Sequence, residues 1–150
     1  MSHAYSRLHY HLVFSTKDRK RLIVPDIKDR LYAYMNGIIR NLDGVVQEIG
    51  GVEDHIHLLF FSPPKHSLSD VIRDLKANSS SWVHETWPER AAFAWQRGYG
   101  IFSVSESNVE AVREYIRNQD ERHRQMTFED EYLALLRKHN IEYDLRYVFD

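Results

Sequence analysis

Four parts of the chain predict β-strands: the first alternates imperfectly between apolar and polar positions, the third contains the apolar run from Ile56 to Phe61, and the fourth is rich in aromatic residues. The strands are expected over Leu8–Thr16, Val45–Val52, His55–Ser62 and Trp95–Val104. The second and third segments are separated by two residues only, so they are expected to form a hairpin. Two glycines in the fourth segment indicate a bulge or the close approach of another backbone.

Between and after these segments, apolar residues recur every three or four positions, which is typical of amphipathic helices. Helices are expected from Pro25 to Gly44, from Ser67 to Trp87, from Asn108 to Arg124 and from Thr127 to His139. The tail from Ile141 to Phe149 is apolar enough to be expected to pack against the rest of the chain.

The order of these elements predicts the fold class. Strand, helix, strand, strand, helix and strand, followed by two further helices, is the split βαβ arrangement of an α+β protein. Its antiparallel sheet carries helices on one face, with the C-terminal helices as additions. At 150 residues and 17.9 kDa, the chain is expected to form a single domain over residues 1–150.

Two pairs of polar residues stand out against this pattern. His55 and His57 are one residue apart in a predicted strand, so both side chains lie on the same face and could clamp a metal ion. Tyr115 and Gln119 are four residues apart in a predicted helix, so the phenol and the carboxamide project side by side.

Each pair also has an ordinary structural interpretation. Histidines in a strand are more often polar positions on a half-exposed face than metal ligands. Tyr115 and Gln119 are compatible with simple helix packing, and Gln119 with a place on the helix surface. His123, four residues further along, is compatible with a phosphate contact, a substitute ligand or a solvent-facing position. The combination of the two pairs favours a functional site.

The order of several motifs is similar to that of a known family. Besides the two pairs, the chain carries the segment His9–Lys17, the pair Pro63 and Pro64, Leu75 with Lys76, the run Ser79–Ser81, and the segment Trp95–Ser105. In this order they resemble the single-tyrosine HUH transposases of the insertion-sequence 200/605 type, including their repeat-associated relatives. The resemblance covers essentially the whole chain.

This resemblance implies a fold, a chemistry and an assembly. The fold is ferredoxin-like, or RRM-like, and the enzymes cut and rejoin single-stranded DNA through a covalent 5′-phosphotyrosine. Tyr115 would be the nucleophile, and His55, His57 and Gln119 would bind a divalent ion, Mg²⁺ or Mn²⁺. The expected partners are hairpin-bearing single-stranded DNA and a second copy of the chain, because the tyrosine helix of one subunit can complete the histidine site of the other.

The residue types refine these expectations about the metal. Imidazole and amide ligands suit Mn²⁺ better than Mg²⁺, and they do not exclude Zn²⁺. The candidate residues include no carboxylate cluster, which argues against two-metal nuclease chemistry. Glu53 and Asp54, next to the histidines, are candidates for groups that orient the ligands.

The amino-acid composition indicates where in the cell the protein is expected. The chain has no cysteine, no apolar run long enough to span a membrane and no apolar leader, so we expect no membrane insertion and a cytoplasmic location.

The net charge of the chain is −2, but the charges are unevenly distributed, because residues 1–40 hold eight basic and three acidic residues. The candidate phosphate contacts are Lys17, Arg19, Lys20, Arg21, Arg73, Lys76, Arg97 and Arg117. Tyr99 and Phe102 are candidate base-stacking platforms, although core positions are the stronger expectation for both.

Two other functions use the same residues. A nucleic-acid-binding regulator of this fold would bind DNA without cutting it. A metal-dependent phosphodiester hydrolase would use water as the nucleophile and Tyr115 as a structural residue. A mobile-element transposase and a domesticated relative share the same motifs, so the sequence leaves that choice open.

Overall fold

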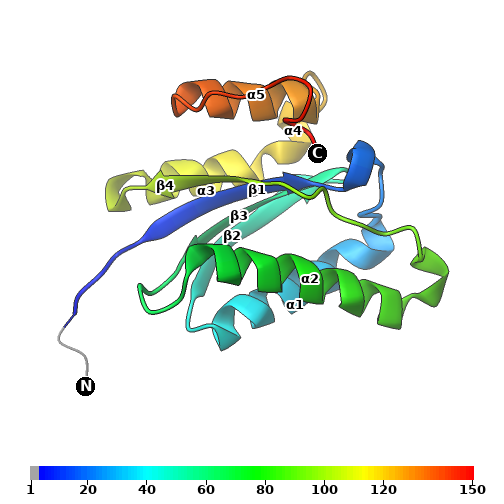
Figure 1. Cartoon of the computed structure of the whole chain (residues 1–150), viewed down its shortest axis with the longest axis horizontal. Coiled ribbons are helices and arrows are strands. Elements are labelled where there is room, and N and C mark those ends of the chain that lie inside the picture. The colour runs from blue at the N-terminus through cyan, green and yellow to red at the C-terminus, as the bar shows by residue number, and fades with distance from the viewer. Residues whose placement is uncertain (1–3) are drawn as a thin grey trace.

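A four-stranded antiparallel sheet lies at the centre of the computed structural model, which describes residues 4–150 (Figure 1). The strands follow the spatial order β2, β3, β1 and β4, and each neighbouring pair is antiparallel. Their bounds are β1 His9–Ser15, β2 Val45–Val52, β3 His55–Phe61 and β4 Gly100–Val104. This order places β3, which carries the two histidines, in the interior of the sheet and confirms the predicted split βαβ fold.

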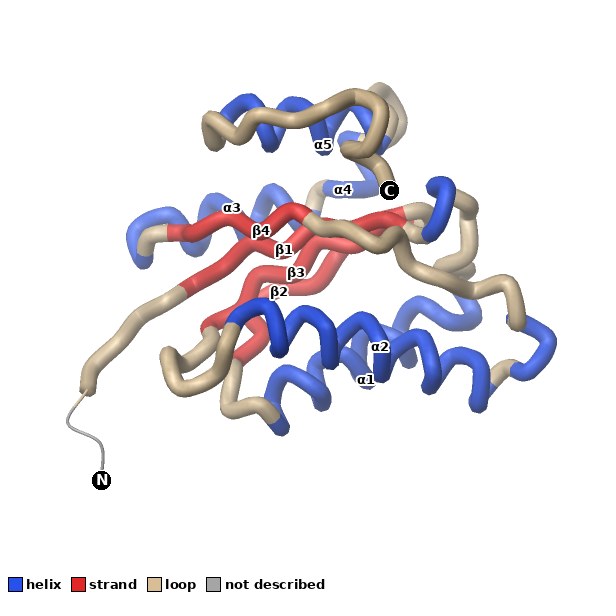
Figure 2. The backbone as a smooth tube through the Cα atoms, in the orientation of Figure 1, coloured by secondary structure: helices blue, strands red, loops and turns tan. Residues whose placement is uncertain are grey.

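Helices α1 (Pro25–Asn41) and α2 (Leu68–Thr86) cover one face of the sheet (Figure 2). Alternation along the two central strands supplies the apolar side chains beneath them, including Leu12, Phe14, Ile56 and Leu58, all fully buried. Because these side chains take one face, the residues between them in sequence must face the other side of the sheet.

That other face is covered by the C-terminal helices, α3 (Val109–Arg117), α4 (Gln119–Arg122) and α5 (Phe128–Lys138) (Figure 1). Thr127 caps α5 by accepting a hydrogen bond from the backbone N–H of Asp130. A second apolar cluster fills this side, made of Val13, Phe102, Phe128, Tyr132, Leu135 and Leu136. The helices predicted as additions therefore enclose the face of the sheet that carries the polar candidates.

The single helix predicted over Asn108–Arg124 is wrong, because the chain forms two helices there. The backbone leaves helical geometry at Asn118, with φ of −94° and ψ of 20°, and α4 begins at the next residue. Asparagine is a weak helix former whose side chain competes for backbone hydrogen bonds, so a break at this residue is physically reasonable. A 3₁₀ turn, η3 (Glu106–Asn108), precedes α3.

The predicted strand Trp95–Val104 is also shorter than expected. Trp95 forms an isolated bridge with Thr16, and regular pairing with β1 begins only at Gly100. Between these points the ammonium group of Lys76 donates hydrogen bonds to the carbonyls of residues 96, 97 and 98, at 2.7 to 3.0 Å. The backbone N–H of Gly98 donates to the carbonyl of Asp150. These contacts draw the segment away from the sheet.

The remaining elements are two short 3₁₀ turns, η1 (Lys17–Arg19) and η2 (Pro88–Arg90), and a packed C-terminal tail. Tyr143, Val148 and Phe149 pack against the second apolar cluster, as predicted for the tail. Over residues 4–150, none of the helices has both the length and the apolar character needed to cross a lipid bilayer.

Candidate active site

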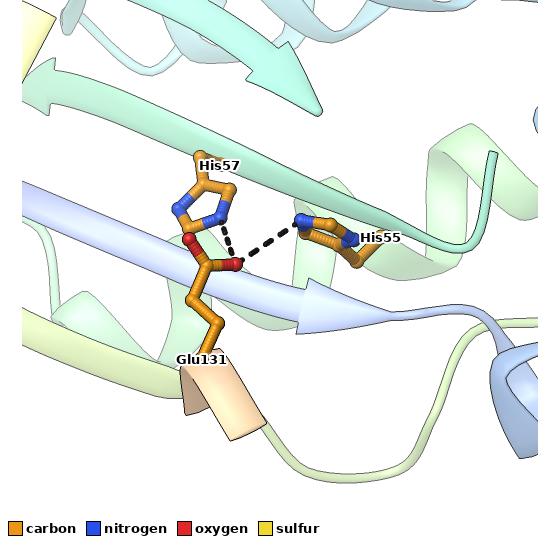
Figure 3. A group of neighbouring side chains, drawn as sticks. All are labelled: His55, His57 and Glu131. Atoms are coloured by element: carbon orange, nitrogen blue, oxygen red, sulfur yellow. Dashed lines mark hydrogen bonds and ion pairs between the residues drawn. The ribbon is translucent and has the colours of Figure 1, made fainter. Parts of the chain in front are cut away.

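His55 and His57 project from β3 toward the C-terminal helices, as the alternation of the strand predicted. Both side chains are fully buried, whereas Ile56 between them belongs to the apolar core on the opposite face. Figure 3 shows the two imidazole rings converging on one carboxylate, that of Glu131 from α5. The two histidines therefore share a buried site that α5 covers.

Glu131 is the centre of this site. One of its oxygens, Oε1, lies 3.3 Å from Nε2 of His55, 3.1 Å from Nε2 of His57 and 2.9 Å from Nε2 of His123. Glu131 is itself 2% exposed, which is unusual for a carboxylate and requires compensating partners. The three imidazole groups provide this compensation.

The outer nitrogens of the two strand histidines are also bound. Nδ1 of His55 lies 2.7 Å from Oδ1 of Asp54, and Nδ1 of His57 lies 2.8 Å from Nε2 of His11 on β1. Because Nδ1 of each ring is engaged in this way, Nε2 is the atom that both rings present to Glu131. A metal ion at this point would be bound through Nε2 of both histidines.

Tyr115 and Gln119 reach the same carboxylate from α3 and α4. The Tyr115 hydroxyl and the Gln119 amide group both donate hydrogen bonds to Oε2 of Glu131, the latter at 2.8 Å. The amide oxygen of Gln119 lies 2.8 Å from Nε2 of His55. The predicted helix is broken at Asn118, but the side chains of Tyr115 and Gln119 still face one point, as their spacing predicted. All of these contacting residues come from a single chain.

The surroundings shift the pKa values of these groups in different directions. Burial lowers the pKa of His55, but hydrogen bonds to Asp54 and Glu131 outweigh it and raise that pKa to about 9. Burial dominates at His57, where it lowers the pKa despite the nearby carboxylate of Glu131. His11 likewise has a pKa well below the ordinary value, because of burial and the neighbouring His57.

The carboxylate and the phenol respond to the same contacts. Burial alone would raise the pKa of Glu131, but hydrogen bonds from His123, His55 and His57 overcome it and hold that pKa far below its usual range. At Tyr115, burial and then the negative charge of Glu131 raise the pKa of the hydroxyl. In this arrangement Tyr115 is held in its protonated form.

The donor atoms fit a divalent metal ion. His55, His57 and Glu131 each offer a ligand atom, and these atoms lie within 4.8 Å of one another. The amide oxygen of Gln119 faces the same point through its contact with Nε2 of His55. Two imidazoles with carboxylate and amide oxygens form a mixed donor set that suits Mn²⁺ and is compatible with Mg²⁺ or Zn²⁺.

Half of the candidate phosphate contacts cluster on the loop after β1. Lys17, Lys20 and Arg21 are exposed there, and Arg19 donates a hydrogen bond to the carbonyl of Phe149. Arg19 and Arg21 line a cavity of about 870 Å³ that extends to Asp54 and His123 at the edge of the site. This part of the predicted basic track therefore lies beside the candidate metal site.

The other four candidates do not join that cluster. Arg73 and Lys76 lie on α2, on the opposite face of the sheet, where Arg73 pairs with Asp70 at 3.1 Å and Lys76 binds backbone carbonyls. Arg117 donates a hydrogen bond to Glu48 on β2, and Arg97 is exposed. The two aromatic candidates also differ, since Phe102 is buried in the core and Tyr99 is 36% exposed.

Two residues of the site were missed by the sequence analysis. Glu131 lies in a run of three acidic residues at the start of a helix, which is an ordinary position for them. Its spacing from Phe128 and Leu135 nevertheless places it on the buried stripe, and a carboxylate there was the available signal. His11 faces the same side as Val13 and His9, in a strand whose alternation was imperfect. Its contact with His57 depends on the pairing of β1 with β3.

Comparison with known proteins gives consistent similarities across the chain. The family described as "Transposase IS200 like" matches residues 4–119. The ISDra2 transposase TnpA of Deinococcus radiodurans is 26% identical over 123 residues, which covers 77% of this chain and 86% of the relative. The transposase of insertion sequence element IS200 from Salmonella typhimurium is 27% identical over 124 residues, covering 79% of this chain and 81% of the relative.

Solved structures show the same architecture. A crystal structure of a Deinococcus radiodurans protein assigned as a transposase superposes with a TM-score of 0.64 at 25% identity, over 79% of this chain and 95% of that one. A REP-associated tyrosine transposase bound to a REP hairpin superposes with a TM-score of 0.61 at 13% identity, over 82% of this chain and 73% of that one. The family match ends at residue 119, before the helix that carries Glu131.

Proposed function

Since the chain belongs to the IS200-like transposase family and its function is therefore that of a transposase, we propose that it cleaves and rejoins single-stranded DNA through a covalent bond to Tyr115. The observation that supports this mechanism most directly is the convergence of the Tyr115 hydroxyl with His55 and His57 on Glu131. A nucleophile and a set of metal ligands thus meet at one carboxylate.

In the proposed reaction, the Tyr115 oxygen attacks the scissile phosphorus and the 3′-oxygen of the preceding nucleotide leaves. The tyrosine gives up its hydroxyl proton, the leaving oxygen becomes a 3′-hydroxyl, and the 5′-phosphate remains joined to the protein. Attack by a 3′-hydroxyl on this phosphotyrosine reverses the step, so rejoining needs no further energy source. Burial and the charge of Glu131 raise the pKa of Tyr115, so attack requires that this hydroxyl first give up its proton.

We propose that His55, His57, Gln119 and Glu131 hold a divalent metal ion, Mn²⁺ or Mg²⁺. When bound, such an ion would neutralise negative charge on the phosphate and orient the scissile bond. The chain's own residues provide the rest of the environment. Asp54 and His11 orient the two imidazole rings, and the apolar cluster under α5 limits the access of water.

We infer that the DNA strand approaches along the cavity beside the loop after β1. Arg19 and Arg21 from the predicted set, together with Lys28 and Arg124, line this cavity, and Asp54 joins it to the site. The cavity wall also carries acidic groups, so the track relies on individual arginine and lysine contacts more than on a large positive field. A hairpin-bearing strand is the proposed substrate, because the similar REP-associated transposase was solved with a REP hairpin.

The resemblance also implied a homodimer with sites shared between subunits, and the dimer stays a prediction. A partner is not needed to complete the site, because Tyr115 and the histidines meet on Glu131 of the same chain. We therefore propose a site completed within one chain, whether or not two chains associate.

Trapping of the covalent intermediate tests this function. Labelled hairpin-bearing single strands are incubated with Mn²⁺ and the protein, and covalent adducts are separated on a denaturing gel. We expect adducts with the unmodified protein, none with Tyr115→Phe, and retained DNA binding by that variant. Tyr99→Phe, which removes an exposed phenol elsewhere, is the matched control and should still form adducts.

Other outcomes would favour the two alternative functions. Cleavage without an adduct, retained in Tyr115→Phe, would indicate a hydrolase that uses water. Binding without cleavage under any metal condition would indicate a regulator. Full cleavage in excess chelator would contradict the metal site while leaving the tyrosine mechanism open.

A further inference from the structure

His11 lies directly behind the metal-facing ring of His57. Its side chain projects from β1, is 4% exposed, and places Nε2 at 2.8 Å from Nδ1 of His57. The two ring centroids are 5.0 Å apart, and the planes are tilted by 30°. His11 also contacts the ring of Tyr115 edge-on, with centroids 5.9 Å apart. The mechanism proposed above uses His11 only to orient His57 and does not depend on which nitrogen of either ring carries the proton.

Metal binding fixes where the proton on His57 must be. Nε2 of His57 is the nitrogen that faces Glu131, and a nitrogen that binds a metal ion uses its lone pair and carries no hydrogen. The proton of the neutral ring then resides on Nδ1, where it needs an acceptor because the ring is buried. The structure supplies that acceptor as Nε2 of His11, provided that this nitrogen is itself unprotonated.

Without a metal ion, a contact between His57 and Glu131 requires the opposite arrangement. Nε2 of His57 lies 3.1 Å from a carboxylate oxygen of Glu131, which can only accept a hydrogen bond. The ring proton of a neutral His57 therefore lies on Nε2, and Nδ1 is a bare acceptor. The hydrogen bond between the two histidines then needs a proton on Nε2 of His11, so the two rings exchange donor and acceptor roles between the states.

We propose that His11 is a positioning residue for the metal ion, and that metal binding reverses the hydrogen bond between His11 and His57. On binding, the Nε2 proton of His57 leaves to solvent, the proton on His11 Nε2 passes to His57 Nδ1, and His11 takes up a proton at its own Nδ1. The two neutral rings of His11 and His57 together carry two N–H protons both before and after metal binding. His11 lines a cavity of about 320 Å³, which gives its ring a route for proton exchange with water.

A histidine is suited to this position because its nitrogens can donate or accept, depending on the tautomer. Asp54, the corresponding partner of His55, can only accept and therefore fixes a proton on Nδ1 of His55 permanently. His11 instead offers a partner to Nδ1 of His57 in both states. The inference rests on the metal site proposed above.

Nuclear magnetic resonance of ¹⁵N-labelled imidazole groups tests the reversal directly. In the metal-free unmodified protein, we expect the proton of His57 on Nε2. With Zn²⁺, a diamagnetic ion that binds imidazole nitrogen, we expect it on Nδ1. A proton on Nδ1 of His57 in both states would overturn the reversal. This measurement needs no variant, so it does not depend on how substitutions affect folding.

Two substitutions then test whether His11 matters for the metal. His11→Phe removes the donor and the acceptor while keeping a ring, and we expect it to weaken Mn²⁺ binding by roughly ten- to a hundredfold, the usual effect of losing a group that supports a ligand. His11→Gln keeps both hydrogen-bonding capacities and should retain most of the affinity. His139→Phe is the matched control, because His139 lines the same cavity but bonds to the carbonyl of Leu135.

The outcomes separate this inference from the proposed function. Unchanged Mn²⁺ affinity in folded His11→Phe, with the unmodified protein binding the ion, would overturn the role of His11 alone. Failure of the unmodified protein to bind Mn²⁺ at all would overturn the metal site itself. Equal losses in His11→Phe and His11→Gln would show that the imidazole acts by packing, which also contradicts the inference.

Discussion

The hydroxyl of Tyr115 donates a hydrogen bond to Glu131, a residue of α5 that lies outside the segment matched by the family. An oxygen of the same carboxylate lies 3.3 Å from Nε2 of His55 and 3.1 Å from Nε2 of His57. The C-terminal helix is therefore part of the candidate site, and it links the proposed nucleophile to the proposed ligands. This relationship makes Glu131 the first residue to test.

Glu131→Gln should weaken Mn²⁺ binding while preserving the shape of the side chain. Within residues 4–150, the substitution removes the one negative charge that contacts both imidazole groups, and an amide is a weaker ligand for a divalent ion. We expect a loss of at least roughly tenfold in affinity, measured by electron paramagnetic resonance of free Mn²⁺. Glu129→Gln is the control, because Glu129 is partly exposed on the same helix and lies 3.8 Å from Arg19. Equal affinity in both variants would exclude Glu131 as a ligand.

Mixing two inactive variants tests whether the site belongs to one chain. Tyr115→Phe lacks the nucleophile and His57→Ala lacks a ligand, so a site shared between subunits would be restored in mixed dimers. Because Tyr115 and His57 meet on Glu131 within one chain, we expect no recovery of adduct formation. The mixture is assayed after denaturation and joint refolding, with the unmodified protein treated identically. Recovery approaching one working site per mixed dimer would contradict the proposal.

Glu106 connects the start of the tyrosine helix to β1 and should contribute stability in a pH-dependent way. It lies in η3, 2.8 Å from Arg7 and in contact with His9. The hydrogen bonds from Arg7 and then His9 lower the pKa of Glu106 from 4.5 to about 2. A lowered carboxyl pKa stabilises the fold above the unfolded-state value, and this stabilisation is lost as the pH falls through the folded-state value.

The corresponding variant is Glu106→Gln. Its melting temperature should lie below that of the unmodified protein at pH 7, and the difference should shrink as the pH falls from about 4.5 toward 2. Because Glu106 is exposed, added salt should also reduce the difference. A gap in melting temperature that stays constant from pH 7 to pH 3 would show that the charge of Glu106 does not contribute.

The sequence predicted most of the site because it depends on local periodicity. Alternation in β3 placed His55 and His57 on one face, and helical spacing placed Tyr115 and Gln119 together. Glu131 was different, because its role arises from how α5 lies over the sheet. The acidic run at the start of that helix is compatible with a solvent-exposed turn, and tertiary packing alone brings one of its members onto the histidines.

Long-range contacts explain other differences as well. The register of β1 against β3 brings His11 next to His57, and no pattern within either strand contains that pairing. The late start of β4 at Gly100 likewise reflects hydrogen bonds from Lys76 on α2. The break at Asn118 has a local cause instead, the weak helix propensity of asparagine. Local periodicity therefore predicted which elements form, whereas contacts between elements decide where β4 begins.

Gly50 sets the distance between the tyrosine helix and the sheet. It pairs with His57 across the two strands, and a Cβ at this position would lie 2.6 Å from the carbonyl oxygen of Ile116. That separation is too short, so Gly50→Ala must push α3 away from β2. Ile116 is adjacent to Tyr115, so the nucleophile would move with the helix, whereas His55 and His57 on β3 would not.

We therefore expect Gly50→Ala to slow adduct formation more than it weakens Mn²⁺ binding. A displacement near 1 Å at a reacting group can cost roughly a hundredfold in rate, which single-turnover cleavage with saturating DNA would measure. Gly37→Ala is the matched control, because a Cβ there meets nothing within 4 Å. It should keep the full rate and raise the free energy of unfolding by about 0.5 to 1 kcal/mol, as expected for alanine in a helix. A normal rate in folded Gly50→Ala would show that the close approach of α3 to β2 does not position Tyr115.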